Sequence, residues 1–227
     1  MDQERQRIVV ATHNKGKVAE IERILASVLG PQAQRFEFVT SGELGLPDPV
    51  EDGVTFSQNA LIKARDAAAR SGLPAMADDS GLIVDVMGKA PGILSARWSG
   101  EHGDDAANNA LLLKQLADIP DRHRGARFCC ACALVVPSKA EGFGFRELVE
   151  EGRMVGRIIR QPRGQQGFGY DPLFVPDDQS RVTEEQKRAN QGLPLTSAQM
   201  TAEQKNAISH RGAAIRATVA HFSEVFR

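Results

Sequence analysis

Two adjacent aspartates stand inside the apolar stretch 75–86, and this stretch constrains the fold more than any other part of the chain. The runs 75–77 and 82–86 are typical of buried strands, and the polar residues between them predict a turn that separates two strands. Neighbouring side chains on an extended segment point to opposite faces, so only one of Asp78 and Asp79 can easily enter a given cleft. A carboxylate beside an apolar core is unfavourable unless a metal, a lysine or a transferable proton compensates for it. The alternative is a polar turn whose two carboxylates are solvated.

The composition indicates a soluble globular protein with a substantial core. The 227 residues are 41% hydrophobic and 25% charged, which suits one large domain or two closely packed lobes. The net charge of -1 gives no support for binding nucleic acid or an anionic membrane, so any phosphate site has to be local. No apolar run approaches the roughly 20 residues of a membrane span, and residues 1–7 do not resemble a signal sequence. We therefore expect a cytoplasmic protein.

The three cysteines, Cys129, Cys130 and Cys132, are crowded into one apolar segment. No second cysteine cluster completes a zinc site, and no distant cysteine offers a disulfide. The pattern predicts reduced thiols on a buried strand, as in a reducing cytoplasm. A metal site at this segment is the alternative.

The first element of the chain ends in a candidate phosphate loop. Residues 8–11 predict a strand, and a helical apolar stripe follows from Val18 until Gly30-Pro31. Between them lie Lys15, Gly16 and Lys17. The unpaired N–H groups of a helix N-terminus favour an anion, and lysines add positive charge. The loop does not match a Walker A motif, and an ordinary turn is the alternative.

The remaining pattern alternates helices and strands early and clusters strands in the middle. We expect an α/β fold with a long mixed β-sheet flanked by helices. Residues 1–227 would form a single domain of two lobes without a clean linker, with a hairpin turning at Glu151-Gly152 in the second lobe. A capping box at Thr201 predicts a further helix. The other expected elements are strands at 36–39, 127–136, 143–150 and 153–159, helices at 55–70 and 104–119, loops at 95–100 and 164–171, a mobile polar excursion at 177–197, and a C-terminal helix whose apolar stripe is Ile215, Val219, Phe222 and Phe226.

Five motifs occur in an order that is similar to one known family. They are Thr-His-Asn-Lys-Gly-Lys at 12–17, Ala-Asp-Asp-Ser-Gly-Leu at 77–82, Ala-Pro-Gly-Ile at 90–93 with Ser-Ala-Arg at 95–97, Gly-Phe-Gly-Tyr-Asp at 167–171, and Glu-Gln-Lys-Asn-Ala-Ile-Ser-His-Arg at 203–211. Over residues 8–222 the chain resembles the inosine/xanthosine triphosphate pyrophosphatases. The resemblance implies Mg²⁺-dependent hydrolysis of ITP, dITP or XTP between the α- and β-phosphates, an active-site cleft between two lobes, and a homodimer. His13 stands where many relatives have Gly.

The resemblance also implies roles for particular residues. Glu51 and Asp79 match the metal-binding carboxylates, Asp79 matches the catalytic general base, and Ser80 matches a hydroxyl that contacts substrate. A triphosphate requires cations and N–H donors, and Lys15, Lys17, Lys63, Lys205 and Arg211 supply positive charge. A pocket that donates to O6 of hypoxanthine or xanthine rejects adenine. Phe168 and Tyr170 would stack on the base, and Asp171, His210 and Arg211 would read it. The expected substrate-binding set is Thr12, His13, Asn14, Lys15, Gly16, Lys17, Lys63, Ser80, Phe168, Gly169, Tyr170, Asp171, Lys205, His210 and Arg211.

Two other functions compete with this interpretation. The first is a related pyrophosphatase with another base preference, against which the motifs at 167–171 and 209–211 argue. The second is a regulatory module that binds nucleotide without catalysis, but binding alone requires no general base such as Asp79. Turnover of dITP and XTP discriminates between them.

Overall fold

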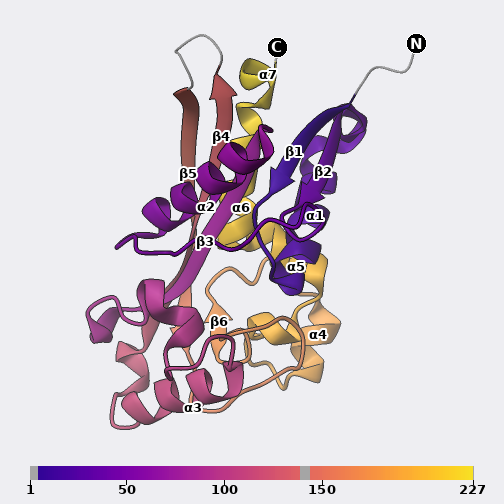
Figure 1. Cartoon of the computed structure of the whole chain (residues 1–227). Coiled ribbons are helices and arrows are strands. Elements are labelled where there is room, and N and C mark those ends of the chain that lie inside the picture. The colour runs from indigo at the N-terminus through magenta and orange to yellow at the C-terminus, as the bar shows by residue number, and fades with distance from the viewer. Residues whose placement is uncertain (1–4, 139–143, 227) are drawn as a thin grey trace. The chain divides into compact units, whose positions relative to one another are not determined.

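The computed structural model describes residues 5–138 and 144–226 and has helices packed on a β-sheet (Figure 1). The strands are β1 (Gln6–Val10), β2 (Phe36–Thr40), β3 (Ala75–Val84), β4 (Gly125–Ser138), β5 (Gly144–Ile158) and β6 (Phe174–Pro176). The helices are α1 (Lys15–Leu29), α2 (Phe56–Ser71), α3 (Asp105–Gln115), α4 (Glu184–Ala189), α5 (Ala202–Ile208), α6 (His210–Ala220) and α7 (Phe222–Val225). Short 3₁₀ helices lie at Gly30–Arg35, Asp85–Met87, Gly92–Arg97, Asp121–His123 and Ser197–Gln199.

The sheet has six strands in the order β2-β1-β3-β4-β5-β6. Strand β1 pairs in parallel with β2, where Ile8 faces Phe38, and in parallel with β3. Strand β6 pairs antiparallel with β5. The expected α/β class with a mixed sheet is confirmed.

The chain divides into two compact units whose boundaries fall within strands. Unit 1 comprises the described parts of Met1–Asp79, Cys130–Gly152 and Arg211–Arg227, and unit 2 comprises Ser80–Cys129 and the described chain Arg153–His210. The boundaries lie inside β3, β4 and β5.

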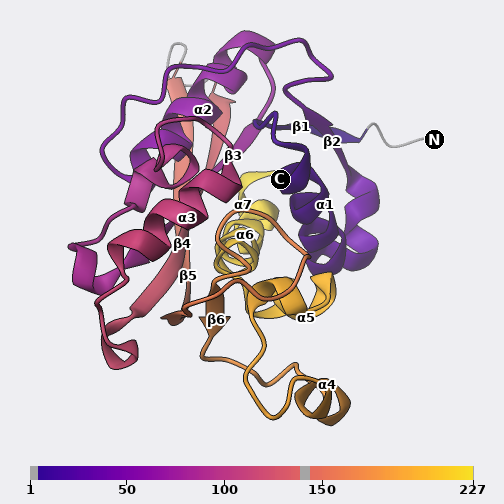
Figure 2. The ribbon, with the colours of Figure 1, turned by 90° about the horizontal axis from the view of Figure 1, so that it is seen from below.

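Alternation along the strands builds two cores in unit 1, one on each face of its strands. Helix α2 lies on one side of β1 and β3, and α1 and α6 lie on the other (Figure 2). Helix α2 presents small residues, which allows close packing on the sheet. The α2 face buries Val9, Ala11, Ala75, Ala77, Ala131 and Ala133, whereas the α1 and α6 face buries Ile8, Val10, Met76, Cys130, Cys132 and Leu134.

The C-terminal apolar stripe packs in the second of these cores, as predicted. Ile215 and Phe222 are buried, and Phe36 of β2 meets Phe222 and Phe226 at ring-centroid distances of 5.2 and 5.6 Å. Edge-on aromatic contacts of this kind are favourable beyond the area that they bury. The stripe therefore anchors the end of the chain against β2.

The turn expected between two strands at Asp78-Asp79 is wrong. Residues Ala75–Val84 form one continuous strand, β3, and every residue of it is buried except the half-buried Ser80 and Ile83. The period of two continues through the polar residues, so Asp78 follows Met76 and Asp79 follows Ala77. Charged partners on each face, described below, allow both carboxylates to remain in a buried strand.

The expected hairpin at Glu151-Gly152 is also wrong. Strand β5 runs without a break from Gly144 to Ile158, and alternate residues from Gly152 to Ile158 are buried. Gly152 continues this alternation instead of turning the chain. Gly156 lies so close to β6 that a Cβ atom there would stand 2.2 Å from the Val175 carbonyl oxygen. The predicted start of a strand at Phe143 lies outside the described residues.

Unit 2 has its own core between α3 and the ends of the strands. Leu112 and Leu116 pack with Leu82, Val84 and other buried residues. Helix α3 ends at Gln115, earlier than the predicted Ile119. The loop expected at 95–100 is partly the 3₁₀ helix Gly92–Arg97.

The polar excursion expected at 177–197 is more ordered than its composition suggests. It contains α4, which Thr183 opens with a capping box. Val182 and Leu195 pack with Met200 in a small separate core. A capping box also begins α5 at Thr201, as predicted.

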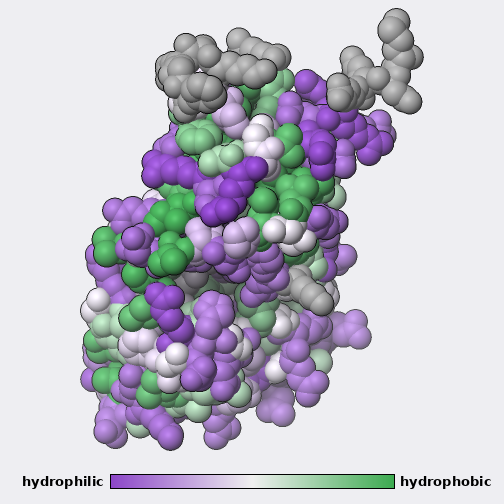
Figure 3. All heavy atoms as spheres, viewed as in Figure 1, coloured by the Kyte–Doolittle hydropathy of each residue, from purple (hydrophilic) through white to green (hydrophobic). Residues whose placement is uncertain are grey.

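The surface mixes hydrophilic and hydrophobic residues on the face shown in Figure 3. Among the described residues, the exposed large apolar side chains include Val50 and Val54. Within the described residues, no helix is both long enough and apolar enough to cross a membrane.

The cysteines occupy β4 as thiols, and their burial predicts unequal reactivity. Cys130 and Cys132 are 1% exposed, while Cys129 is half-buried. Burial raises the pKa of the Cys132 thiol to about 12. The thiolate is the reactive form, so burial slows the reaction of Cys132 both by disfavouring the thiolate and by excluding the reagent.

We expect Ellman's reagent at pH 8 to titrate Cys129 rapidly in the native protein. Cys130 and Cys132 should react only after urea unfolding, which serves as the control for total thiol. Rapid reaction of all three thiols in the native protein would contradict this burial.

Candidate functional site

The loop before α1 is preorganised by its own side chains. Asn14 caps the helix, because its Oδ1 accepts a hydrogen bond from the Lys17 N–H at 3.1 Å. The Asn14 N–H donates in turn to Thr12 Oγ1 at 3.2 Å. Gly16 is exposed at the first turn, where helix N–H groups favour an anion. The Lys15 side chain is outside the described part of the structure.

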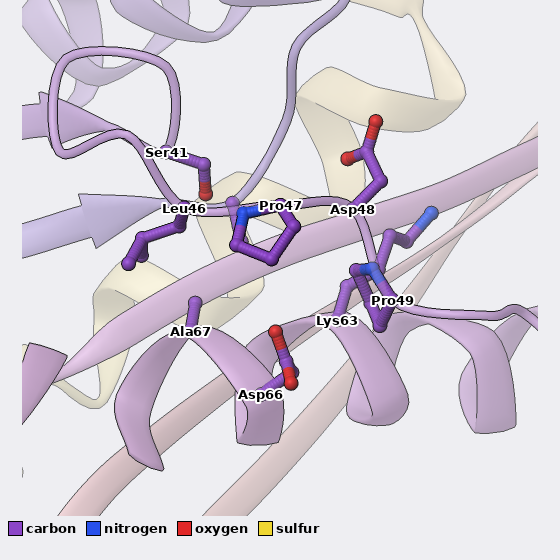
Figure 4. A pocket seen from close by; sticks show the side chains of 9 residues that line it. Ser41, Leu46, Pro47, Asp48, Pro49, Lys63, Asp66 and Ala67 are labelled. Carbon is purple, nitrogen blue, oxygen red and sulfur yellow. The ribbon is translucent and has the colours of Figure 1, made fainter. Parts of the chain in front are cut away.

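His13 ties this loop to the segment that carries Glu51. Its Nδ1 lies 2.6 Å from Asp48 Oδ1. Residues 46–49 in turn cover α2, where Lys63, Asp66 and Ala67 line a cavity of about 10 Å³ beneath them (Figure 4). The loop before α1, the 46–49 segment and α2 are therefore linked within unit 1.

Lys63 brings two predicted metal ligands together. Its Nζ lies 3.1 Å from Asp79 Oδ1 and 3.3 Å from Glu51 Oε1. Asn59, one turn earlier on α2, donates from Nδ2 to Asp79 Oδ2 at 3.4 Å. Lys63 and Asp79 are buried, at 8% and 9% exposure. Asp79 therefore faces α2, as its position in β3 requires.

The electrostatics of this group keep Lys63 charged and make Asp79 more basic. Burial lowers the pKa of Lys63, but the carboxylates of Asp79, Asp78 and Glu51 more than offset this, and the net shift is upward. Burial raises the pKa of Asp79, and this outweighs the lowering by Lys63 and Lys17, so the net shift of Asp79 is also upward. A buried carboxylate with a raised pKa is suited to accept a proton.

Asp78 faces the opposite side of β3 and belongs to a buried ionic group. Arg211 donates from Nε to Asp78 Oδ2 at 3.1 Å and from Nη1 to Glu20 Oε2 at 2.7 Å. Lys17 Nζ lies 3.4 Å from the same Asp78 oxygen. Burial lowers the pKa of Arg211, but Asp78 and Glu20 more than offset it, and the net shift is upward. Asp78 thus joins Lys17 on α1 to Arg211 at the start of α6.

The donor set around Asp79 contains the carboxylates of Asp79 and Glu51. Among the described residues, no three of His, Cys, Asp and Glu gather as a metal-binding group. Mg²⁺ usually takes one or two carboxylates and completes its shell with water and substrate phosphates. Glu51 and Asp79, both within 3.3 Å of the same Lys63 nitrogen, fit that requirement.

Three residues of the expected substrate-binding set, Phe168, Asp171 and Lys205, contact one another in unit 2 at the turn 167–171. Asp171 Oδ2 accepts hydrogen bonds from the Phe168 N–H at 3.0 Å and from Lys205 Nζ at 2.6 Å. Lys205 Nζ also lies 5.0 Å from the centre of the Phe168 ring, a cation–π arrangement. Gly167 is required here, because a Cβ atom would stand 2.1 Å from Asp171 Oδ2.

The two aromatic residues of this turn differ in their surroundings. Phe168 is half-buried, whereas Tyr170 is 4% exposed and packs in the unit 2 core. The Tyr170 hydroxyl donates to the Ser95 carbonyl at 2.9 Å. Tyr170 therefore fixes the turn, and the Phe168 ring is the more accessible of the two.

His210 and Arg211, adjacent in sequence, have different partners. The His210 ring stacks on Phe128 of unit 2, with centroids 4.9 Å apart and an interplanar angle of 13°. Arg211 bonds to Asp78 and Glu20 in unit 1, as described above, and its expected contact with a base stays a prediction. Ser80, half-buried, follows Asp79 in β3.

Sequence reasoning missed four residues that the structure brings to these groups: Glu20, Asn59, Asp105 and Asn109. Asn59 stands four residues before Lys63 on one helix face, a spacing that could have identified it. Glu20 stands three residues after Lys17 on α1, but its partner is 191 residues away. Asp105 and Asn109 bond to the turn at Gly169, and polar residues on a helix gave no signal of this contact.

The comparisons with known proteins agree with one another. The model of the Ham1 family matches residues 8–221. A dITP/XTP pyrophosphatase of Bifidobacterium longum subsp. infantis is 56% identical, over 93% of this chain and 96% of that protein. A dITP/XTP pyrophosphatase of Streptomyces coelicolor is 48% identical, over 94% of this chain and 95% of that protein.

Solved structures give the same result. A nucleoside-triphosphatase/dITP/XTP pyrophosphatase of Mycobacterium abscessus is 48% identical, with a TM-score of 0.68 over 94% of this chain and 99% of that one. A HAM1 protein of Coxiella burnetii is 36% identical, with a TM-score of 0.77 over 96% of this chain and 99% of that one.

Proposed function

The chain belongs to the Ham1 family, and we propose that it hydrolyses dITP, ITP and XTP to the nucleoside monophosphate and pyrophosphate. The family resemblance of the five motifs is thereby confirmed. The observation that supports the chemistry is the convergence of the buried Lys63 and Asp79 with the half-buried Glu51. Removal of such nucleotides from the precursor pool is the corresponding role in the cell.

The group in unit 1 is suited to the triphosphate. Lys63 and Lys17 are cations held in place by Asp79 and Asp78, so little reorganisation is needed when phosphate charge develops. The N-terminus of α1 adds N–H donors. We assign the phosphates to Lys17, Lys63 and the loop from Thr12 to Gly16.

Asp79 is the proposed general base. It would accept a proton from the water that attacks the α-phosphorus, while the α–β bridging P–O bond breaks and pyrophosphate leaves with the bonding electrons. Lys63, 3.1 Å from its carboxylate, orients it, together with the Asn59 amide. Glu51 and Asp79 would hold Mg²⁺, which neutralises phosphate charge when it is bound.

The group in unit 2 is suited to a 6-oxopurine. Phe168 would stack on the base, and Lys205, which Asp171 holds, would donate to the 6-oxo oxygen. Adenine carries an amino group at this position and would leave the buried donor unpaired. His210 supports Phe128 beside this group. We further propose that the protein is a homodimer in the cytoplasm.

The reaction is tested by identifying its products. With dITP and Mg²⁺, phosphorus NMR should show pyrophosphate and dIMP, and omission of Mg²⁺ should abolish turnover. Release of orthophosphate and dIDP would contradict cleavage between the α- and β-phosphates. Absence of any turnover would favour the nucleotide-binding module.

Lys17→Ala is expected to weaken dITP binding about 10-fold, because it removes a cation that lies near the phosphates and has no neutral substitute. Calorimetry in an Asp79→Asn background separates binding from turnover. Arg23→Ala on the exposed face of the same helix is the matched control, and its affinity should remain that of the parent. Equal affinity in the Lys17 variant would place this lysine outside the binding site.

A further inference from the structure

Two side chains of α3 bond to the two backbone polar groups of Gly169, its N–H and its carbonyl. The Gly169 N–H donates to Asp105 Oδ2 at 2.6 Å, and the Gly169 carbonyl accepts from Asn109 Nδ2 at 2.9 Å. Asp105 and Asn109 are four residues apart and therefore lie on the same face of the helix. Gly169 has a φ of +62°, a left-handed conformation that glycine adopts without strain. Its backbone is thus held by side chains instead of by regular secondary structure.

This residue lies between the groups that we assign to base binding. Phe168 precedes it, and Asp171, which holds Lys205, follows two residues later. The turn closes on itself through the bond from the Phe168 N–H to Asp171. The bond from Asp105 fixes the peptide group that joins Phe168 to Gly169, so the contacts from α3 restrict where the Phe168 ring can stand.

Helix α3 does not need these two contacts for its own placement. Asp104 caps the helix by accepting from the Ala107 N–H at 2.9 Å. Asn108 bonds to the Ser99 N–H and the Ala96 carbonyl, and Leu112 is fully buried in the core. Asp105 is exposed and contributes little to packing. The role of Asp105 and Asn109 is therefore to hold the backbone of Gly169.

We propose that Asp105 and Asn109 are positioning residues that clamp Gly169 and thereby set the affinity for the purine base. The inference rests on the proposed function, because it takes the turn 167–171 as the base-binding element. Asp105 acts only as an acceptor and Asn109 as a donor, so variants of nearly the same shape separate their roles.

Asn109→Asp is the decisive variant. It removes the donor and sets a carboxylate against the Gly169 carbonyl, so the KM for dITP should rise roughly 10-fold while kcat changes less than about threefold. Asp105→Ala removes the acceptor and should act similarly. Asp105→Asn keeps an oxygen acceptor, so its affinity for dITP should be close to that of wild type. If Asp105 acted only through its charge, Asp105→Asn would lose as much affinity as Asp105→Ala.

Asp104→Ala is the matched control for helix stability. It removes the cap of α3 and should lower the urea midpoint, yet the KM for dITP should stay within about twofold of the wild-type value. Hydrogen exchange adds a direct readout of the clamp, because the Gly169 amide should exchange faster in Asp105→Ala than in Asp104→Ala.

The outcomes distinguish this inference from the function on which it rests. Normal wild-type turnover with an unchanged KM in Asn109→Asp would overturn the clamp alone. Absence of dITP turnover in the wild-type enzyme would overturn the proposed function and the role of the clamp in base binding with it. A KM increase in Asp104→Ala as large as that in Asn109→Asp would reduce both effects to helix stability and also overturn the clamp.

Discussion

Asp79→Asn should lower turnover of dITP by at least about 100-fold while dITP still binds, which is the usual scale for loss of a general base or a metal carboxylate. The substitution keeps the shape of the side chain, so β3 and the neighbouring Lys63 remain in place. It removes the negative charge that would accept a proton. The same charge would bind Mg²⁺ together with Glu51 in the proposed site. Steady-state kinetics at saturating Mg²⁺ and calorimetry with dITP measure the two effects separately.

Asp66→Asn supplies the comparison for this variant. Asp66 lies on α2 one turn from Lys63 and bonds to Arg70, so its substitution alters the same helix without touching Asp79. Its turnover should remain near that of wild type. Turnover of Asp79→Asn within threefold of wild type would remove Asp79 from the mechanism.

Arg211→Met should lower the free energy of unfolding by about 3–5 kcal/mol, because breaking a buried ion pair leaves uncompensated charge inside the protein. Arg211, Asp78 and Glu20 are each no more than 3% exposed. Within the described residues, Arg211 is the cation that pairs with Glu20, and Lys17 partly compensates Asp78. Urea unfolding, followed by circular dichroism, measures the loss.

The double variant Glu20→Gln with Arg211→Met tests the cause of that loss. Removing the carboxylate charge together with its cation should recover part of the lost stability, so the two effects should not add. If Arg211→Met lowered the free energy of unfolding by less than about 1 kcal/mol, the claim that this ionic group stabilises α6 would be wrong.

The helices were predictable because their signals are local. Asn14 and Thr55 cap α1 and α2, Thr201 opens α5 with a capping box, and apolar stripes continue behind each of them. Such signals lie within a few residues of the element that they begin. The sequence therefore located these helices and the loop between β1 and α1.

The strand predictions were wrong where contacts between residues distant in sequence decide the structure. Asp78 and Asp79 looked like a turn, because the cations that stabilise them in β3 come from α1, α2 and α6. In the same way, Glu151-Gly152 looked like a hairpin, although Gly152 continues the alternation of β5. Local turn propensity cannot reveal a partner that is 133 residues away.

The candidate site shows the same difference between local signals and contacts that depend on distant residues. Motif resemblance found Lys63, Asp79, Asp171 and Lys205, which the structure brings together in pairs. It could not separate Phe168 from Tyr170, because burial of Tyr170 depends on the unit 2 core. The clamp at Gly169 was also invisible, since its two residues lie about 60 positions away in sequence.

The central claim is tested most directly by competition between dITP and dATP for the wild-type enzyme. We predict that the ratio of kcat/KM for dITP to that for dATP is at least about 100, because adenine leaves a buried donor unpaired. XTP should compete as dITP does. Equal values of kcat/KM for dITP and dATP would contradict selection for a 6-oxopurine.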